Sequence, residues 1–200
     1  MRAAIIACAA ALAACGAAPS ADRHDRAMID EARSAALPGD VIFKKGDGLW
    51  GRLAARFSDN DDGYGHVGIV DQRDGELVVI HAGGDPATRN GRVQESRFSD
   101  FLGAARAAAL YRPLLDEKGA GAELDYALAA VRRNAPFDAA FSLDTEEALY
   151  CTELVWRALS AGLGEDAAPE KSERGGKVYV AIDDLQESRF LQPVWRSRAE

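Results

Sequence analysis

A β-hairpin signal constrains the fold of this chain more than any other part of its sequence. Residues 65–71 (GHVGIVD) and 77–82 (LVVIHA) are two apolar runs of the kind found in buried strands. An Asp-Gly dipeptide at 74–75 lies between them, and this dipeptide favours the tight turn of a hairpin. We therefore predict two adjacent antiparallel strands, with His66 at the start of the first and His81 near the end of the second. Their pairing can bring both imidazoles to one face of the sheet.

Apolar periodicity in the rest of the chain predicts an α+β domain. Further strands are expected at the apolar runs 41–43, 92–94, 107–111 and 178–181. Helices are expected within 19–36, at 49–57, 119–133 and 146–163, and from about residue 183. Ser96 is expected to cap a short helix containing Phe98, Phe101 and Leu102, because serine side chains often accept from the free N–H groups at a helix start.

The size and charge of the chain narrow its function. Its 200 residues suffice for one domain with a sizeable core, and 48% hydrophobic content is typical of a folded protein. The net charge is −8 and no block of Lys or Arg occurs. A nucleic-acid partner is therefore not expected, since binding to nucleic acid needs a basic surface.

Residues 1–14 are predicted to be a lipoprotein signal peptide. Arg2 is followed by an apolar run that is too short to span a bilayer but suits a signal-peptide core. Residues 12–16 (LAACG) resemble the lipobox of bacterial lipoproteins, in which the cysteine, here Cys15, receives a diacylglyceryl group and becomes the new N-terminus. The alternative is an ordinary secretory peptide that is cut near Ala18.

The lipobox resemblance implies a location and a domain layout. The mature protein is expected in the bacterial cell envelope, held by its N-terminal lipid, because several acyl chains anchor a protein stably. Gly16 after the lipidated cysteine resembles the sorting pattern for the outer membrane, facing the periplasm. We expect residues 15–36 to form a tether and an N-terminal helix, and residues 37–200 to form the catalytic domain.

The three cysteines leave a single thiol for chemistry. Cys8 lies in the signal peptide and Cys15 is the predicted lipidation site, so Cys151 stands alone in the mature protein. It is a buried core thiol, an intermolecular linker or a nucleophile. A structural zinc site built from thiolates is not expected, because such sites need several ligands. The acidic loop at 58–65 lacks EF-hand spacing, and no metal is expected there.

The position of Cys151 favours the nucleophile. The residues after it have the spacing of a helix that docks on the core, which places Cys151 near the start of that helix. A helix start and a nearby imidazolium both lower the pKa of a thiol. His66 is the candidate general base, and His81 on the partner strand is the candidate that orients it.

Three segments resemble the permuted NlpC-type, papain-like families, especially the YiiX/YebB-like group. They are residues 37–43 (LPGDVIF), 64–70 (YGHVGIV) and 149–156 (LYCTELVW), and the resemblance covers about residues 37–160. The order of His before Cys is the permuted one. Lecithin retinol acyltransferase-like proteins share this order and a second His on the next strand. The resemblance implies a circularly permuted papain-like fold, with a small antiparallel sheet or barrel packed against helices.

The resemblance also implies roles for individual residues. Cys151 corresponds to the nucleophile and His66 to the general base. The third polar residue falls on His81, where YiiX-like members more often place Glu, so the orienting charge of a carboxylate is missing. The Tyr150 hydroxyl or the backbone N–H of Cys151 is the candidate donor to the oxyanion.

The expected activity is cleavage of an amide bond through an acyl-enzyme, without a cofactor or a metal. The expected substrate is a peptide or an acyl amide, and a cell-wall peptide is the first choice for an enzyme anchored in the periplasm. One alternative is an acyl-lipid amidase, esterase or acyltransferase on the same fold. Another is an inactive module that binds a peptide or an acyl group.

Overall fold

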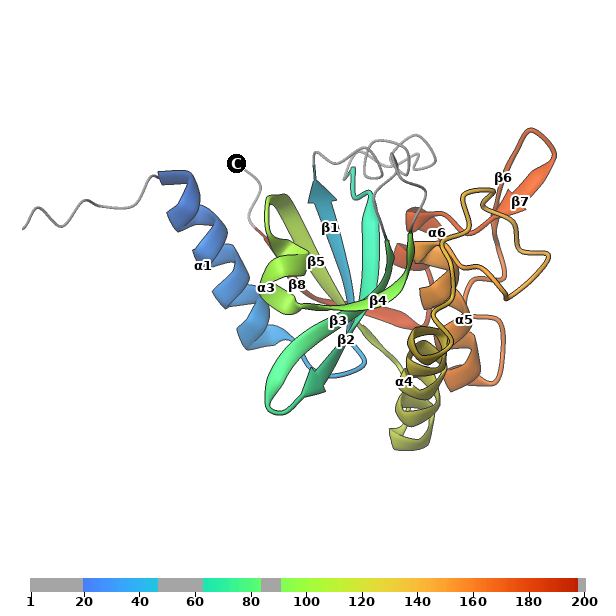
Figure 1. Ribbon diagram of the computed structural model, residues 1–200, viewed down its shortest axis with the longest axis horizontal. Helices are drawn as coiled ribbons and strands as arrows, with labels where there is room; N and C mark the ends of the chain where they lie inside the picture. Colours follow the sequence, from blue (N-terminus) through green and yellow to red (C-terminus); the bar gives the residue numbers. More distant parts are fainter. Residues whose placement is uncertain (1–19, 47–62, 84–90, 198–200) are drawn as a thin grey trace, which may run out of the picture.

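An antiparallel sheet is the centre of the computed structural model, which describes residues 20–46, 63–83 and 91–197 (Figure 1). Within these residues the sheet has six strands in the order β4-β3-β2-β1-β5-β8. The strands are β1 (Val41–Gly46), β2 (His66–Arg73), β3 (Glu76–Gly83), β4 (Arg92–Arg97), β5 (Ala105–Pro113) and β8 (Leu191–Arg196). The predicted α+β class is confirmed.

Helices cover both faces of this sheet (Figure 1). The helices are α1 (Ser20–Ala35), α3 (Phe98–Leu102), α4 (Glu117–Arg132), α5 (Cys151–Leu163) and α6 (Ile182–Gln186). One core lies between the sheet and the pair α4 and α5, and the other lies between the sheet and the pair α1 and α3. A separate two-stranded ribbon is formed by β6 (Ser172–Arg174) and β7 (Lys177–Tyr179). No helix among the described residues is long and apolar enough to cross a membrane.

The predicted hairpin is present as β2 and β3. Val70 pairs with Val79, and Arg73 pairs with Glu76 at the turn. The two turn residues, at 74–75, have φ values of 50° and 85°. A two-residue turn with positive φ at both positions matches the twist of the strands, and Asp-Gly favours it. The local turn chemistry thus fixes the register on which the site depends.

Strand β2 sends alternate side chains to the two layers, as the pleat requires. Val67 and Ile69 belong to the core under α5, whereas Val70 belongs to the core under α3. His66 is opposite Lys44 in the register of β1 and β2, and its ring stacks on Phe101 of α3. Neighbouring residues of this strand therefore face different helical layers.

The helix that carries Cys151 starts later than predicted. The expected start was residue 146, whereas α5 begins at Cys151. Arg157 explains the difference, because its guanidinium donates to the carbonyl oxygens of Leu143 and Thr145 at 3.2 Å each. These bonds hold the preceding segment beside α5 in a path that is not helical.

The prediction that Ser96 caps α3 is wrong. The N-cap residue is Arg97, and no side chain caps this helix. Strand β4 continues through Ser96 to Arg97, so the serine is still part of the sheet. Its hydroxyl contacts His81 on the neighbouring strand instead.

Other elements differ from the prediction in smaller ways. The strand expected at 178–181 is β7, which starts earlier and ends at Tyr179. Strand β8 was not predicted. The helix expected at 49–57, the acidic loop at 58–62, the predicted signal peptide at 1–14 and Cys15 lie outside the described residues.

A carboxyl group is buried between α4 and the start of β1. Glu123 is fully buried, and neither of its side-chain oxygens has a hydrogen-bond partner within the described part of the chain. It lies against Gly39, and burial together with the charge of Asp40 raises its pKa to about 8. Asp40 itself is paired, with two 2.8 Å bonds from the guanidinium of Arg112. Glu123 is therefore a neutral acid at pH 7 inside the core.

Candidate functional site

Cys151 is the first residue of α5 and is buried against the sheet. The backbone N–H groups of Val67, Thr152 and Cys151 itself face its sulfur. These donors favour a thiolate, but burial disfavours it more strongly and raises the pKa of the thiol to about 11. The thiol is thus neutral at pH 7, in contrast to the lowered pKa expected for a cysteine at a helix start.

Two hydrogen bonds with the backbone of Val180 hold the start of α5. The hydroxyl of Thr152 donates to the carbonyl oxygen of Val180 at 2.6 Å. The N–H of Val180 donates to the hydroxyl oxygen of Tyr150 at 2.9 Å. Val180 lies between β7 and α6, so it fixes both neighbours of Cys151 to the C-terminal part of the chain.

The hydroxyl of Tyr150 is therefore already engaged as an acceptor. Its ring is buried and packs on Phe141, with the ring centroids 5.0 Å apart. Burial raises the pKa of this phenol, so it keeps its proton. The structure gives Tyr150 a clear packing role, and the predicted support of an oxyanion stays a prediction.

The two imidazoles are joined on the hairpin, as predicted. Nε2 of His66 lies 3.0 Å from Nδ1 of His81, and the two rings are nearly perpendicular at 89°. Nε2 of His81 in turn lies 2.9 Å from the hydroxyl oxygen of Ser96. A continuous chain of hydrogen bonds therefore runs from β2 through β3 to β4.

The surroundings of this pair keep it neutral. Phe101 stacks on His66, with centroids 5.4 Å apart, and the ammonium of Lys44 lies 4.4 Å from the centre of the same Phe101 ring. Burial, the charge of His81 and the charge of Lys44 lower the pKa of His66 well below 6.5. Burial and Lys44 lower the pKa of His81 to about 4. Both imidazoles are uncharged at pH 7.

Gly83 gives the imidazole pair its space. A Cβ at this position would lie 2.9 Å from Nδ1 of His81 and 3.6 Å from Nε2 of His66. The first distance is shorter than real Cβ contacts. A residue with a side chain at this position would therefore displace the His81 ring from its partner.

The thiol and the imidazole pair approach the same end of β2 from different layers. Cys151 belongs to the core under α5, whereas His66 stacks on α3. The sulfur reaches the N–H of Val67, the residue directly after His66. Among the described residues, no hydrogen bond joins the sulfur to either imidazole. The structure thus unites His66 with His81 and places the sulfur of Cys151 against the backbone of Val67, the residue after His66, in the other layer.

Three residues of this site were not assigned to it from the sequence. Ser96 extends the hydrogen-bond chain, Phe101 stacks on His66 and meets His81 edge-on, and Lys44 supplies a cation beside them. Extending the strand at 92–94 to Arg97 would have placed Ser96 on the sheet, within reach of His81. The position of Lys44 beside His66 follows only from the register of β1 with β2, which the sequence does not specify.

A small cavity lies beside the thiol. It measures ≈ 20 Å³ and is lined mainly by apolar side chains. Its lining residues are Phe141, Cys151, Thr152, Tyr179, Val180, Ala181 and Ile182. A space of this size holds about one water or a methyl-sized group.

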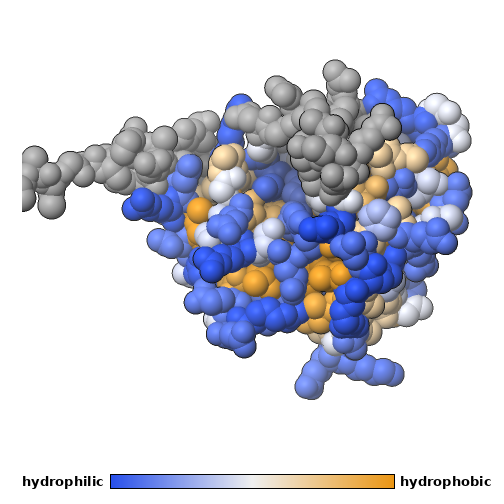
Figure 2. Space-filling view, in the orientation of Figure 1, coloured by the Kyte–Doolittle hydropathy of each residue, from blue (hydrophilic) through white to orange (hydrophobic). Residues whose placement is uncertain are grey.

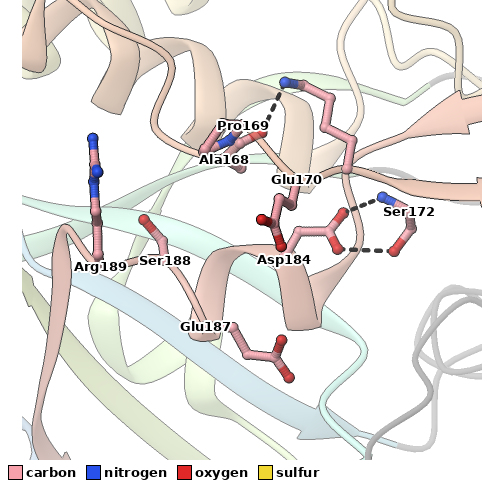
Figure 3. A pocket seen from close by; sticks show the side chains of 9 residues that line it. Ala168, Pro169, Glu170, Ser172, Asp184, Glu187, Ser188 and Arg189 are labelled. Carbon is pink, nitrogen blue, oxygen red and sulfur yellow. Dashed lines mark hydrogen bonds between the residues drawn. The ribbon is translucent and has the colours of Figure 1, made fainter.

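A more open hollow of ≈ 470 Å³ lies near α6, and neither the thiol nor the imidazoles line it (Figure 3). Its polar groups bond to one another: Asp184 accepts from the N–H and the hydroxyl of Ser172, and Lys171 donates to the carbonyl of Ala168. On the face shown in Figure 2, hydrophilic residues cover most of the described surface around smaller apolar areas. The candidate reactive groups are therefore the thiol of Cys151 and the two imidazoles on the hairpin, and they lie away from this hollow.

Comparison with known proteins identifies the fold. The crystal structure of the metalloprotein YiiX from Escherichia coli O157:H7 is similar to this chain, with a TM-score of 0.67 and 18% sequence identity. The similarity covers 82% of this chain and 99% of YiiX. This chain has a YiiX-like fold. No family model and no curated protein sequence matches it.

The metal of YiiX prompts a test of the residues present here. Among the described residues, no group of three His, Cys, Asp or Glu side chains is arranged to hold a metal ion. The facing nitrogens of His66 and His81 bond to each other, and the ammonium of Lys44 adds a positive charge beside them. These described groups do not fit a cation, and we derive no step through a metal.

Proposed function

We propose that this protein is a hydrolase that cleaves an amide bond, with Cys151 as nucleophile and His66 as general base. One observation carries this proposal. The sulfur at the start of α5 lies against the N–H of the residue that follows His66, and His66 is held by His81. A nucleophile, a base and a group that orients the base are the parts that acyl transfer requires.

The resting charges suggest how the proton moves. Thiol and imidazole are both neutral at pH 7, because burial raises the pKa of Cys151 to about 11 and lowers that of His66. Nδ1 of His66 therefore takes the thiol proton while the sulfur attacks the carbonyl carbon. The same proton passes to the departing amine when the C–N bond breaks. Water then cleaves the thioester, which restores the thiol and releases the acid.

The proposal requires one movement before attack. Since no hydrogen bond joins Cys151 to His66 within the described residues, one of the two side chains must rotate toward the other. Catalytic hydrogen bonds often form only in the complex with substrate. Because Cys151 belongs to the core under α5 and His66 stacks on α3, this movement must include the backbone at the start of β2.

The N–H groups that face the sulfur are suited to a second task. The backbone donors of Val67, Thr152 and Cys151 are fixed by strand and helix. An oxygen that becomes negative next to the attacking sulfur would lie close to them. Loss of one such donor typically costs about 3 kcal/mol of transition-state stabilisation.

The substrate class follows from the N-terminal signal. A lipid anchor at the predicted site, Cys15, would hold the domain in the cell envelope close to the stem peptides of the cell wall. We therefore propose a cell-wall peptide as substrate. The apolar lining beside the thiol supports a second candidate, an acyl-lipid amide or ester, of which the cavity would accept about one methyl-sized group.

A comparison of two substrate panels tests both candidates. Purified protein is incubated with muropeptides and, separately, with N-acyl lipids, and products are identified by mass spectrometry. We expect product from one panel and a trapped acyl group on the Cys151 peptide after rapid acid quench. Cys151→Ala and Cys151→Ser are the nucleophile variants, and Ser160→Ala on the same helix is the matched control.

The outcomes are distinct. Loss of turnover in both Cys151 variants with normal turnover in the Ser160 variant supports the proposal. Turnover by Cys151→Ala equal to that of the unaltered protein excludes Cys151 as nucleophile for that substrate. Tight binding of a panel member without any product favours the binding module instead.

A further inference from the structure

The chain of hydrogen bonds on the hairpin ends at a hydroxyl that has no role so far. Ser96 lies on β4 and contacts Nε2 of His81 at 2.9 Å, while Nδ1 of His81 contacts Nε2 of His66 at 3.0 Å. Each contact joins two atoms that can act as donor or acceptor. The two bonds are therefore coupled, because a neutral imidazole has one N–H and one free nitrogen.

Only two arrangements of hydrogens satisfy both bonds. In the first, His66 donates from Nε2 to Nδ1 of His81, and His81 donates from Nε2 to Ser96. In the second, Ser96 donates to Nε2 of His81, and His81 donates from Nδ1 to Nε2 of His66. The first leaves Nδ1 of His66 free to accept a proton, and the second places a hydrogen on it.

We propose that Ser96 is a positioning residue that accepts from His81 and thereby keeps Nδ1 of His66 free to act as a base. This inference rests on the proposed function, which needs a proton acceptor at that nitrogen. A hydroxyl can accept in this place because it has two lone pairs and rotates to suit its partner. Ser96 thus sets the tautomer of a residue that it does not touch.

The packing around the pair makes such control necessary. Phe101 lies against both rings, with centroids 5.4 Å from His66 and 5.1 Å from His81. Its side chain has no polar atom that could accept from a ring nitrogen, and its carbonyl oxygen accepts from Lys44. The cation of Lys44 acts on both imidazoles and disfavours a shared extra proton. The neutral pair therefore adopts one of its two tautomeric arrangements. The Ser96 hydroxyl is the last partner in this series of hydrogen bonds.

Nitrogen NMR of the imidazoles tests this assignment on the full chain. Protonated and free ring nitrogens differ strongly in chemical shift, so the spectrum reports each tautomer directly. The variants are Ser96→Ala, Ser96→Thr and Ser96→Asp, and Ser99→Ala is the matched control three residues further along the chain. A His24→Gln variant assigns the third histidine.

We expect His66 and His81 to carry their hydrogens on Nε2 in the unaltered protein. Ser96→Thr should preserve this state because it keeps the hydroxyl. Ser96→Ala leaves the N–H at Nε2 of His81 without an acceptor, which costs more than a ring nitrogen without a donor. It should therefore lower the ratio of His66 with a free Nδ1 to His66 with a protonated Nδ1 by about fivefold, which corresponds to one ordinary hydrogen bond. Ser96→Asp should leave the tautomer unchanged, since a carboxylate only accepts. Ser99→Ala should have no effect.

Two results overturn the inference. One is a hydrogen on Nδ1 of His66 in the unaltered protein. The same conclusion holds if this hydrogen is absent from the unaltered protein but present in Ser96→Asp. The other is a Ser96→Ala spectrum identical to that of the unaltered protein. The spectra are independent of turnover. A protein with the expected tautomers and no activity on either panel would refute the proposed function and leave the assignment of Ser96 intact.

Discussion

The hydroxyl of Thr152 donates a 2.6 Å hydrogen bond to the carbonyl oxygen of Val180, a residue 28 positions further along the chain. Both groups are buried, so neither can turn to water if the bond is lost. Because Thr152 follows Cys151 directly, this bond determines where the thiol lies relative to β2. A thiol at a helix start needs such an anchor, since the first turn of a helix has few bonds of its own.

Thr152→Val should destabilise the fold. Valine has nearly the same shape but cannot donate, and it leaves the buried carbonyl of Val180 without its partner. We expect a loss of about 1–3 kcal/mol in the free energy of unfolding, measured by urea denaturation. Thr152→Ser keeps the hydroxyl and should retain most of the stability. Equal destabilisation by Ser and Val would mean that the methyl group, not the bond, matters.

Cys151 should react slowly with iodoacetamide at neutral pH. Burial raises the pKa of its thiol to about 11, and only the thiolate is a good nucleophile. The alkylation rate should therefore rise about tenfold per pH unit from pH 7 toward pH 11. Mass spectrometry of the Cys151 peptide separates this reaction from that of Cys8 and Cys15. Fast alkylation that is constant from pH 6 to pH 9 would instead reveal a thiolate–imidazolium pair.

Glu123 should make the fold less stable as the pH rises. Its pKa is about 8 in the folded protein and 4.5 for a glutamate in water, so the unfolded chain ionises first. Stability from this group is complete below pH 4.5 and is lost between pH 4.5 and 8, by on the order of 4 kcal/mol. Glu123→Gln cannot ionise and should remove that loss. Urea unfolding at pH 5 and pH 8 measures it.

The matched control for Glu123 is Asp125→Asn, an exposed acid on the same helix. It should leave the difference in stability between pH 5 and pH 8 unchanged. The same difference in Glu123→Gln and in the unaltered protein would show that the buried carboxyl is ionised in the folded state. In that case a counter-charge must reach it from a group that the described residues do not show.

His81 should make the fold less stable as the pH falls, in contrast to Glu123. Burial and Lys44 lower its pKa from 6.5 to about 4, so the unfolded chain binds a proton more readily than the folded one. Stability from this group is present above pH 6.5 and is lost as the pH falls toward 4, by roughly 3 kcal/mol. His81→Gln should reduce the dependence of unfolding free energy on pH between 7 and 5. A steeper dependence in the variant would contradict a neutral buried imidazole.

The sequence predicted the hairpin and the pairing of His66 with His81 because both depend on local signals. An Asp-Gly turn with positive φ at both positions sets the register, and the alternation of a strand then places the two imidazoles on one face. Strand β8 lacked such a signal. It contains Pro193, lies at an edge of the sheet and is mostly exposed, so no alternation marks it.

The details of the candidate site depended on contacts between distant segments. Ser96 has the composition of a helix cap, but the register of β4 with β3 directs its hydroxyl to His81. The pKa of Cys151 follows from burial that only the packed α5 and β2 provide. Sequence patterns identify the candidate residues, whereas the balance between burial and hydrogen bonds that sets their pKa values depends on the packed core.

The position of Val180 in the sequence determines when the start of α5 can be fixed during translation. The chain emerges from the ribosome with His66 and His81 long before Val180, and the hairpin that joins the imidazoles is local. Val180, which holds Tyr150 and Thr152, is synthesised after both of them, 30 and 28 positions further along the chain. A growing chain can therefore join its two imidazoles early, whereas the start of α5 can be fixed only after Val180 has emerged.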